Sequence, residues 1–258
     1  MALDLSKPSS LVTFLLDRSG SMRGILPATL EGFNGYLATL KAERDARIDF
    51  TLLLFDAPGA LIGDRGGLDI EKVCVAKPVA EVPELTSISY IPRGGTPLID
   101  AAIATIRAVE ASLAARSDKP KVVICIQTDG EENQSRASWD ELRRLVSQKQ
   151  EQGWEFNFMG AGIDAYQQAQ RMGVSAQNTM SYDSADVGRT RAAFGASALN
   201  ASGFAAGRLG STVYTAQQRE DSGDRFAAAA GVGAAAALGA AGMLRPAPKK
   251  ELDLTKGA

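Results

Sequence analysis

The chain has 258 residues, of which 45% are hydrophobic and 22% charged, as in soluble globular proteins rather than disordered or fibrous ones. Its 28 basic and 30 acidic residues leave no basic excess to neutralise phosphates, so we expect no nucleic-acid partner. Histidine is absent, which excludes Ser-His-Asp and Cys-His nucleophiles, His-ligated zinc and an imidazole general base.

The compartment is predicted from the first residues and the cysteines. Residues 1–8 lack the basic-then-apolar layout of a signal peptide. Two cysteines 51 positions apart, Cys74 and Cys125, are typical of reduced, buried thiols. We therefore expect a cytoplasmic protein.

Short apolar runs predict the strands of a sheet. They lie at 11–16, 48–55, 122–126 and 154–159, and the first three are apolar almost throughout, as in strands that are covered on both faces. The segment 61–82, which contains the pair Gly66-Gly67, predicts a hairpin or an edge strand.

Helical patterns separate these runs. Residues 98–113 place apolar side chains three and four positions apart on one stripe. Ser138 and Glu141 form a capping box for a helix to about residue 152, and Asp164 can cap a further helix that stops at Gly173. The alternation predicts an α/β fold, with a doubly wound, mostly parallel sheet and helices on both faces.

The composition changes after about residue 202. Residues 203–225 are polar and contain Gly and Ser, and residues 227–242 are almost entirely Ala and Gly. We therefore expect one domain over residues 1–202, then a linker and a flexible Ala/Gly-rich tail over residues 203–258. The 19 uncharged residues 226–244 approach the length of a membrane span but are weakly apolar, so membrane contact is disfavoured.

Oxygen-bearing side chains gather at the predicted carboxyl ends of strands, the edge where open parallel sheets form binding sites. Asp17, Ser19 and Ser21 follow the first strand, Thr96 precedes the helix at 98, and Asp129 follows the strand at 122–126. Such oxygens suit Mg²⁺, Mn²⁺ or Ca²⁺ rather than zinc. Taken alone, the first group also fits a simpler interpretation, in which Asp17 caps the next helix and the serines bind turn amides.

These residues resemble the von Willebrand factor A (VWA) domain family over roughly residues 8–200. The Asp-x-Ser-x-Ser motif, Thr96 in Gly-Gly-Thr-Pro and Asp129 in Thr-Asp-Gly match all five positions of that family's metal-ion-dependent adhesion site, in order. The resemblance implies that the hydroxyls approach the metal directly, that the aspartates act directly or through waters, and that a partner's carboxylate often completes the site. The surrounding sequence resembles VWA proteins of bacteria and phages.

Five further residues are expected to be exposed around the metal, as plain surface or as contacts with an acidic partner. They are Arg18, Met22, Arg23, Arg93 and Gln134.

Other functions remain as alternatives. The segment 160–165 nearly fits a G-x-G-x-x-A dinucleotide fingerprint, but Asp164 would repel a pyrophosphate there. A phosphatase-like, metal-dependent hydrolase could use Asp17 as a nucleophile and Glu131 or Glu132 as a base, although Ser19 stands where haloacid-dehalogenase-like enzymes want a second Asp. A structural subunit inserted through its tail is a third possibility.

The sequence thus predicts a metal-dependent protein-binding or assembly module that is not an enzyme. A Mg²⁺-class ion would capture an acidic side chain of a protein partner.

Overall fold

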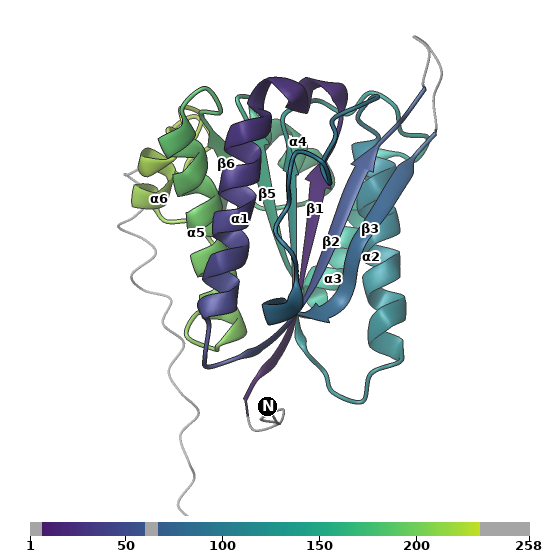
Figure 1. Cartoon of the computed structure of the whole chain (residues 1–258), viewed down its shortest axis with the longest axis vertical. Coiled ribbons are helices and arrows are strands. Elements are labelled where there is room, and N and C mark those ends of the chain that lie inside the picture. Colours follow the sequence, from purple (N-terminus) through teal and green to yellow (C-terminus); the bar gives the residue numbers. More distant parts are fainter. Residues whose placement is uncertain (1–6, 60–66, 233–258) are drawn as a thin grey trace, which may run out of the picture.

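The computed structural model describes residues 7–59 and 67–232, which form a six-stranded sheet between two layers of helices (Figure 1). The strand order is β3-β2-β1-β4-β5-β6. Five strands are parallel, and only β3 is antiparallel to its neighbour β2. The strands are β1 (Ser9–Asp17), β2 (Arg47–Asp56), β3 (Asp69–Pro78), β4 (Lys121–Thr128), β5 (Glu155–Ala161) and β6 (Thr179–Tyr182). The predicted fold class is confirmed.

Helices cover both faces of the sheet (Figure 1). One face packs against α1 (Leu26–Ala42) and α5 (Val187–Ala205), and the other against α2 (Leu98–Ala114), α3 (Trp139–Glu151) and α4 (Ala165–Met172). A short helix, α6 (Ala216–Asp221), lies beyond β6, and three 3₁₀ turns complete the elements: η1 (Gly20–Ile25), η2 (Val79–Glu81) and η3 (Ala176–Asn178). The edge strand expected within 61–82 is confirmed by β3, although residues 61–66 lie outside the described residues, whereas β6 was not foreseen.

The central strand β1 separates two hydrophobic cores because alternate side chains point to opposite faces. Phe14 contacts the α1 side, where its ring lies 5.4 Å from that of Phe33 and 4.9 Å from that of Tyr36. Leu15 belongs to the core under α2. A strand buried on both faces explains the unbroken apolar run, and it holds the carboxyl end of β1 firmly in place.

The predicted caps are present. Ser138 accepts a hydrogen bond from the amide of Glu141 at the start of α3, and Asp164 accepts one from the amide of Tyr166 at the start of α4. Gly173 ends α4 with φ of 88°, a conformation that favours glycine. Both cysteines are buried free thiols, as expected.

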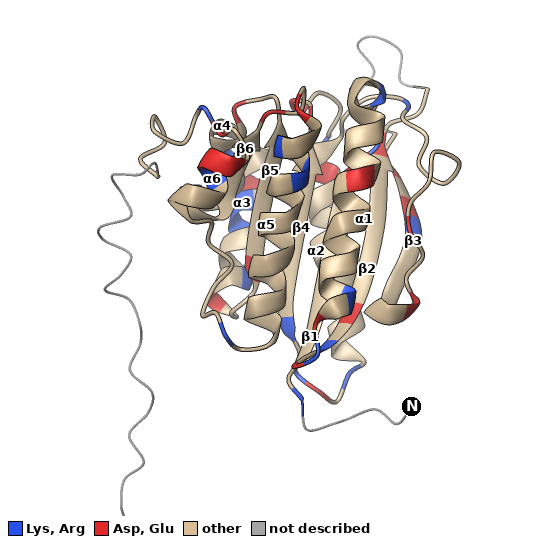
Figure 2. Ribbon diagram, turned by 60° about the vertical axis from the view of Figure 1, so that its left-hand side comes forward, with Lys and Arg blue, Asp and Glu red and all other residues tan. Residues whose placement is uncertain are grey.

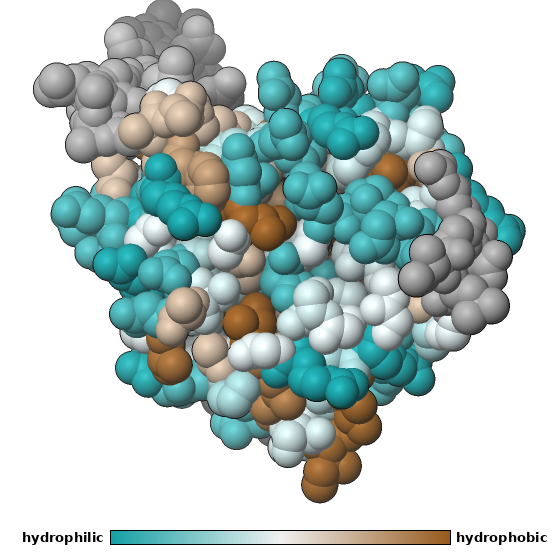
Figure 3. Space-filling view, turned by 90° about the horizontal axis from the view of Figure 1, so that it is seen from above, coloured by the Kyte–Doolittle hydropathy of each residue, from teal (hydrophilic) through white to brown (hydrophobic). Residues whose placement is uncertain are grey.

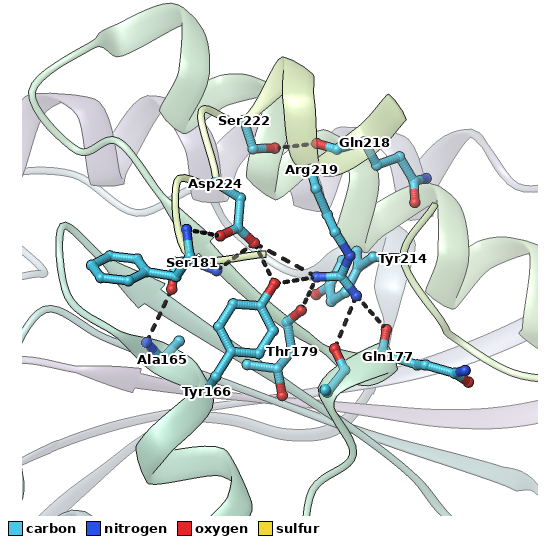
Figure 4. Close-up of polar contacts among 12 residues, drawn as sticks. Ala165, Tyr166, Gln177, Thr179, Ser181, Tyr214, Gln218, Arg219, Ser222 and Asp224 are labelled. Carbon is cyan, nitrogen blue, oxygen red and sulfur yellow. Dashed lines mark hydrogen bonds and ion pairs between the residues drawn. The ribbon is translucent and has the colours of Figure 1, made fainter. Parts of the chain in front are cut away.

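The expected domain boundary at residues 202/203 is wrong, because it falls inside α5. The chain beyond α5 covers the outer side of β6, where Arg219 lies buried (Figure 4). Its guanidinium donates to the backbone oxygens of Gln177 at 2.9 Å and of Thr179, and to the Tyr166 hydroxyl at 2.7 Å. Polar residues of segment 203–227 form hydrogen bonds with backbone groups at the edge of β6. Composition alone cannot distinguish such a segment from a linker.

The rest of the predicted tail, residues 233–258, lies outside the described residues. Within residues 7–59 and 67–232, no helix is both long and apolar enough to cross a membrane. Charges of both signs are interspersed over the helices and loops (Figure 2).

Candidate metal centre

Asp17 is the last residue of β1, and its side chain is fully buried. Its Oδ1 accepts a hydrogen bond from the amide of Ser19 at 2.6 Å, and its Oδ2 accepts one from the hydroxyl of Thr128 at 2.5 Å. Thr128 ends the neighbouring strand β4. The carboxylate is therefore oriented by two adjacent strands of the sheet.

A chain of hydroxyl contacts leads from Asp17 to the second carboxylate. Ser19 Oγ lies 3.1 Å from Ser21 Oγ, and Ser21 Oγ donates to Asp129 Oδ1 at 2.6 Å. Ser19 is buried, whereas Ser21 is exposed, so the chain runs from the protein interior to the surface. Four of the five predicted ligands are thus brought together.

The fifth, Thr96, is held on a neighbouring loop. The carbonyl of Gly94 accepts from the amide of Gly20 at 3.0 Å, which fastens this loop to the turn after β1. Gly94 has φ of 68°, and a Cβ there would lie 2.3 Å from the carbonyl oxygen of Ala57, so a larger residue does not fit. A Cβ on Gly130 would lie 3.2 Å from Thr96 Oγ1 and 3.8 Å from Ser21 Oγ. The two hydroxyls therefore border one small space.

The carboxylates of Asp17 and Asp129 have no cationic partner within residues 7–59 and 67–232. Burial raises the pKa of Asp17 to about 7, and the nearby charge of Asp129 adds a smaller rise. Burial also raises the pKa of Asp129. No Lys or Arg among the described residues forms an ion pair with either one. A site with two unneutralised carboxylates and three hydroxyls fits a hard divalent cation.

The available donor atoms also argue against a metal that prefers thiolate or imidazole ligands. Within the described parts of the chain, no group of three or more His, Cys, Asp or Glu side chains lies close enough to hold a metal. Any ion at this edge would depend on serine and threonine oxygens, which favours Mg²⁺, Mn²⁺ or Ca²⁺.

Two of the five residues expected to be exposed around the site are buried, so their prediction is wrong. Met22 packs in the core under α1 and is 0% exposed. Arg18 is 4% exposed, because its guanidinium turns away from the site to the fully buried Asp56, with Nη2 2.7 Å from Oδ1. A buried carboxylate at the end of β2 requires this counter-charge.

The other three lie nearer the surface. Arg23 is exposed and donates to the carbonyl of Pro92 at 3.2 Å. Arg93 is half-exposed and pairs with Asp56 at 2.9 Å and with Asp69. Gln134 is half-buried against Gly95.

Glu132 and Asn133 are positioning residues that the sequence motifs did not reveal. Glu132 accepts hydrogen bonds from the amide of Ile99 at 2.9 Å and from the amide and hydroxyl of Ser135, and thereby caps α2. Asn133 Oδ1 accepts from the amide of Thr96 at 3.0 Å. They join the Asp129 loop to the Thr96 loop. The available signal was the run of polar residues directly after Asp129.

Helix packing explains the glycines that resemble a dinucleotide-binding motif. A Cβ on Gly160 would lie 2.6 Å from the Cβ of Ala165, so this glycine allows α4 to pack closely on β5. Asp164, which caps α4, occupies the position where a phosphate would bind.

In sequence, no family model and no curated protein matches the chain. Solved structures do match in fold. The open conformation of the pilus adhesin SpaC from Lactobacillus rhamnosus GG has a TM-score of 0.57 at 17% identity, covering 77% of this chain and 30% of the adhesin. A von Willebrand factor type A protein from Catenulispora acidiphila has a TM-score of 0.51 at 14% identity, covering 76% of this chain and 43% of that protein.

A manganese-loaded TRAP protein from Plasmodium vivax has a TM-score of 0.50 at 15% identity, covering 69% of both chains. The chain spans less than half the length of the adhesin and of the Catenulispora protein. These likenesses show that the chain has a VWA fold.

Proposed function

We propose that the chain is a metal-dependent protein-binding module. Asp17, Ser19, Ser21, Thr96 and Asp129 would hold a Mg²⁺-class ion, and the ion would capture an acidic side chain of a protein partner. The observation that carries this proposal is the hydroxyl chain between two carboxylates that have no cationic partner among the described residues.

When bound, the ion supplies a positive centre that can accept one more anionic ligand. The chain's own residues prepare that centre. Thr128 and the Ser19 amide orient Asp17, and Asn133 holds Thr96 through its amide. Exposed Ser21 and partly exposed Asp129 leave the outer side of the site accessible to a partner. Arg23 adds positive charge nearby, which favours an acidic ligand, whereas the charge of Arg93 is compensated by Asp56 and Asp69.

The fold likeness supports this proposal, because the matching structures include an adhesin and a manganese-loaded protein. We propose binding rather than catalysis. Glu132, one of the two residues considered as a hydrolytic base, already accepts hydrogen bonds from three backbone amides at 2.9, 2.8 and 2.6 Å and from a serine hydroxyl at 2.7 Å. No geometric feature of the described residues favours the hydrolase over the binding module.

Calorimetry with Mn²⁺ tests the metal part of the proposal. The wild-type chain should bind one Mn²⁺, and Ser21→Ala should weaken binding at least tenfold, because it removes a ligand oxygen. Ser112→Ala, which changes a serine on α2, is the matched control and should bind as the wild type does. Equal Mn²⁺ binding by all three proteins would refute the assignment.

Capture of partners tests the protein-binding part. Proteins retained from an extract of the source cells in Mg²⁺ should be released by EDTA and should not bind to the Ser21→Ala chain. A partner that binds equally well without metal would contradict the proposed role of the site.

A further inference from the structure

Two isoleucines on the loop that leads from η2 to Thr96 are exposed to solvent. Ile88 is 86% exposed and Ile91 is 59% exposed. Ile91 lies two positions before Arg93, whose amide donates to the carbonyl of Arg18 at 2.8 Å. Viewed from the carboxyl ends of the parallel strands, the surface is mostly hydrophilic (Figure 3). The two isoleucines are therefore exposed apolar side chains on the loop that leads to Thr96.

The turn that carries Ile88 is firmly held. The amide of Thr86 donates to Ser89 Oγ at 2.9 Å, and the amide of Tyr90 donates to the carbonyl of Thr86 at 2.9 Å. Tyr90 is fully buried, and its hydroxyl donates to the backbone oxygen of Asp17. The exposed isoleucines are thus tied to the metal loop itself and need little ordering when a ligand binds.

This combination defines the ligand that the surface suits. Arg23 and a divalent ion favour a carboxylate, and Ile88 and Ile91 favour apolar side chains close to it. A segment in which an acidic residue stands between apolar residues has this chemistry.

Outside the described residues, the chain contains the triplet Leu-Asp-Leu twice. Leu3, Asp4 and Leu5 are followed by Ser and Lys, and Leu252, Asp253 and Leu254 are followed by Thr and Lys. Both copies lie outside the described residues, but their sequence and their distance along the chain from the domain are known.

Only the second copy can reach the metal centre of its own molecule. Asp4 precedes the start of β1 by five residues, which span about 17 Å at most when fully extended. The metal centre lies at the other end of β1, about 27 Å away, so Asp4 cannot reach it. Asp253 follows Val232 by 21 residues, up to about 70 Å, across a domain about 45 Å wide.

The chain passes the edge that carries the metal centre before its last described residues, of which Ala229 and Ala230 border a pocket with Asp164 and Gly173 beside α4. The carbonyl of Ser222 accepts from the amide of Asp183, just after β6, and Phe226 borders a pocket with Gly162 and Asp183. These residues follow the carboxyl ends of β5 and β6, which is the sheet edge that carries the metal centre.

We propose that Asp253 docks on the metal centre of its own chain, with its neighbouring leucines against Ile88 and Ile91. The inference rests on the proposed function. The segment would occupy the site until a partner with a stronger acidic segment displaces it, because a tethered ligand acts at an effective concentration near millimolar.

A labelled peptide of residues 249–257 tests the proposal on the full-length chain in saturating Mn²⁺, with fluorescence anisotropy as the readout. The peptide should bind Asp253→Asn at least tenfold more tightly than the wild type, whose site is already occupied. Adding Ile88→Ser to Asp253→Asn should weaken the peptide about tenfold, and EDTA should abolish its binding. Glu251→Gln removes the same charge two positions away and, like Asp4→Asn, should behave as the wild type.

The outcomes separate the two proposals. If Mn²⁺ itself fails to bind, the proposed function fails and the inference with it. Self-docking is wrong if Mn²⁺ binds but the peptide has the same affinity for Asp253→Asn as for the wild type. It is also wrong if Glu251→Gln raises the peptide's affinity as much as Asp253→Asn does. In both cases the proposed metal centre is unaffected. Mn²⁺-dependent oligomers in sedimentation that disappear in Asp4→Asn or Asp253→Asn would place the segment on a second molecule and overturn docking within one chain.

Discussion

The hydroxyl of Thr128 donates a 2.5 Å hydrogen bond to Asp17 Oδ2, so the end of strand β4 orients the carboxylate at the end of strand β1. Both residues are fully buried. The site's first carboxylate is therefore part of the sheet, while Ser21 and Asp129 lie nearer the solvent.

Thr128→Val should weaken Mn²⁺ binding by about 10- to 100-fold, the usual cost of losing a group that orients a metal ligand. The methyl group keeps the side-chain volume, so circular dichroism should be unchanged. Thr128→Ser retains the hydroxyl and should bind Mn²⁺ nearly as the wild type does. If the valine variant binds equally well, the orientation of Asp17 by Thr128 has no role in the site.

Glu132→Ala should lower the free energy of unfolding by about 2 kcal/mol, because four donors lose their acceptor at the start of α2 and in the loop before α3. Chemical denaturation measures this change. The neighbouring Glu131 is exposed, and Glu131→Ala should have little effect. Equal effects of the two substitutions would show that the hydrogen bonds of Glu132 do not stabilise the fold.

Arg219→Met should destabilise the domain by about 3 kcal/mol, because it leaves Asp224 buried without its ion partner and frees three carbonyl groups near the edge of β6 (Figure 4). Thermal unfolding followed by circular dichroism is the test, with the exposed Gln217→Ala as the control. A chain that ends at residue 202 should be unstable for the same reason. Full stability of that shorter chain would restore the domain boundary expected from composition.

The contact between Glu43 and Arg208 predicts a dependence on acid. The hydrogen bond from Arg208 lowers the pKa of Glu43 from 4.5 to about 2 in the folded chain, and Ser202 adds to the shift. A lowered folded pKa stabilises the fold above pH 4.5, and this contribution is lost as the pH falls toward 2. Denaturation between pH 5 and pH 2.5 should therefore show a steeper loss of stability in the wild type than in Arg208→Ala. Arg44→Ala, beside Glu43, should retain the wild-type slope.

The sequence was most informative where one residue type has one physical use. Unbroken apolar runs predicted the buried parallel strands, and Asp164 and Gly173 predicted both ends of α4. The candidate oxygen ligands could be proposed from the sequence because the topology of a parallel sheet brings the loops after β1 and β4 to one edge.

Long-range polar pairing could not be predicted in the same way. Arg18 follows Asp17 directly, yet it is buried because Asp56, 38 positions away, requires its charge. Arg219 stands in a segment with the composition of a linker and is buried by its contacts with β6. A charged residue's burial depends on partners that sequence spacing does not reveal.

Anomalous diffraction from crystals grown with Mn²⁺ tests the proposed metal centre most directly. We expect one manganese peak within bonding distance of the hydroxyl oxygens of Ser19, Ser21 and Thr96, and no such peak in crystals of Ser21→Ala. Manganese bound elsewhere, or a site with no peak while Mn²⁺ binds in solution, would contradict the proposed centre.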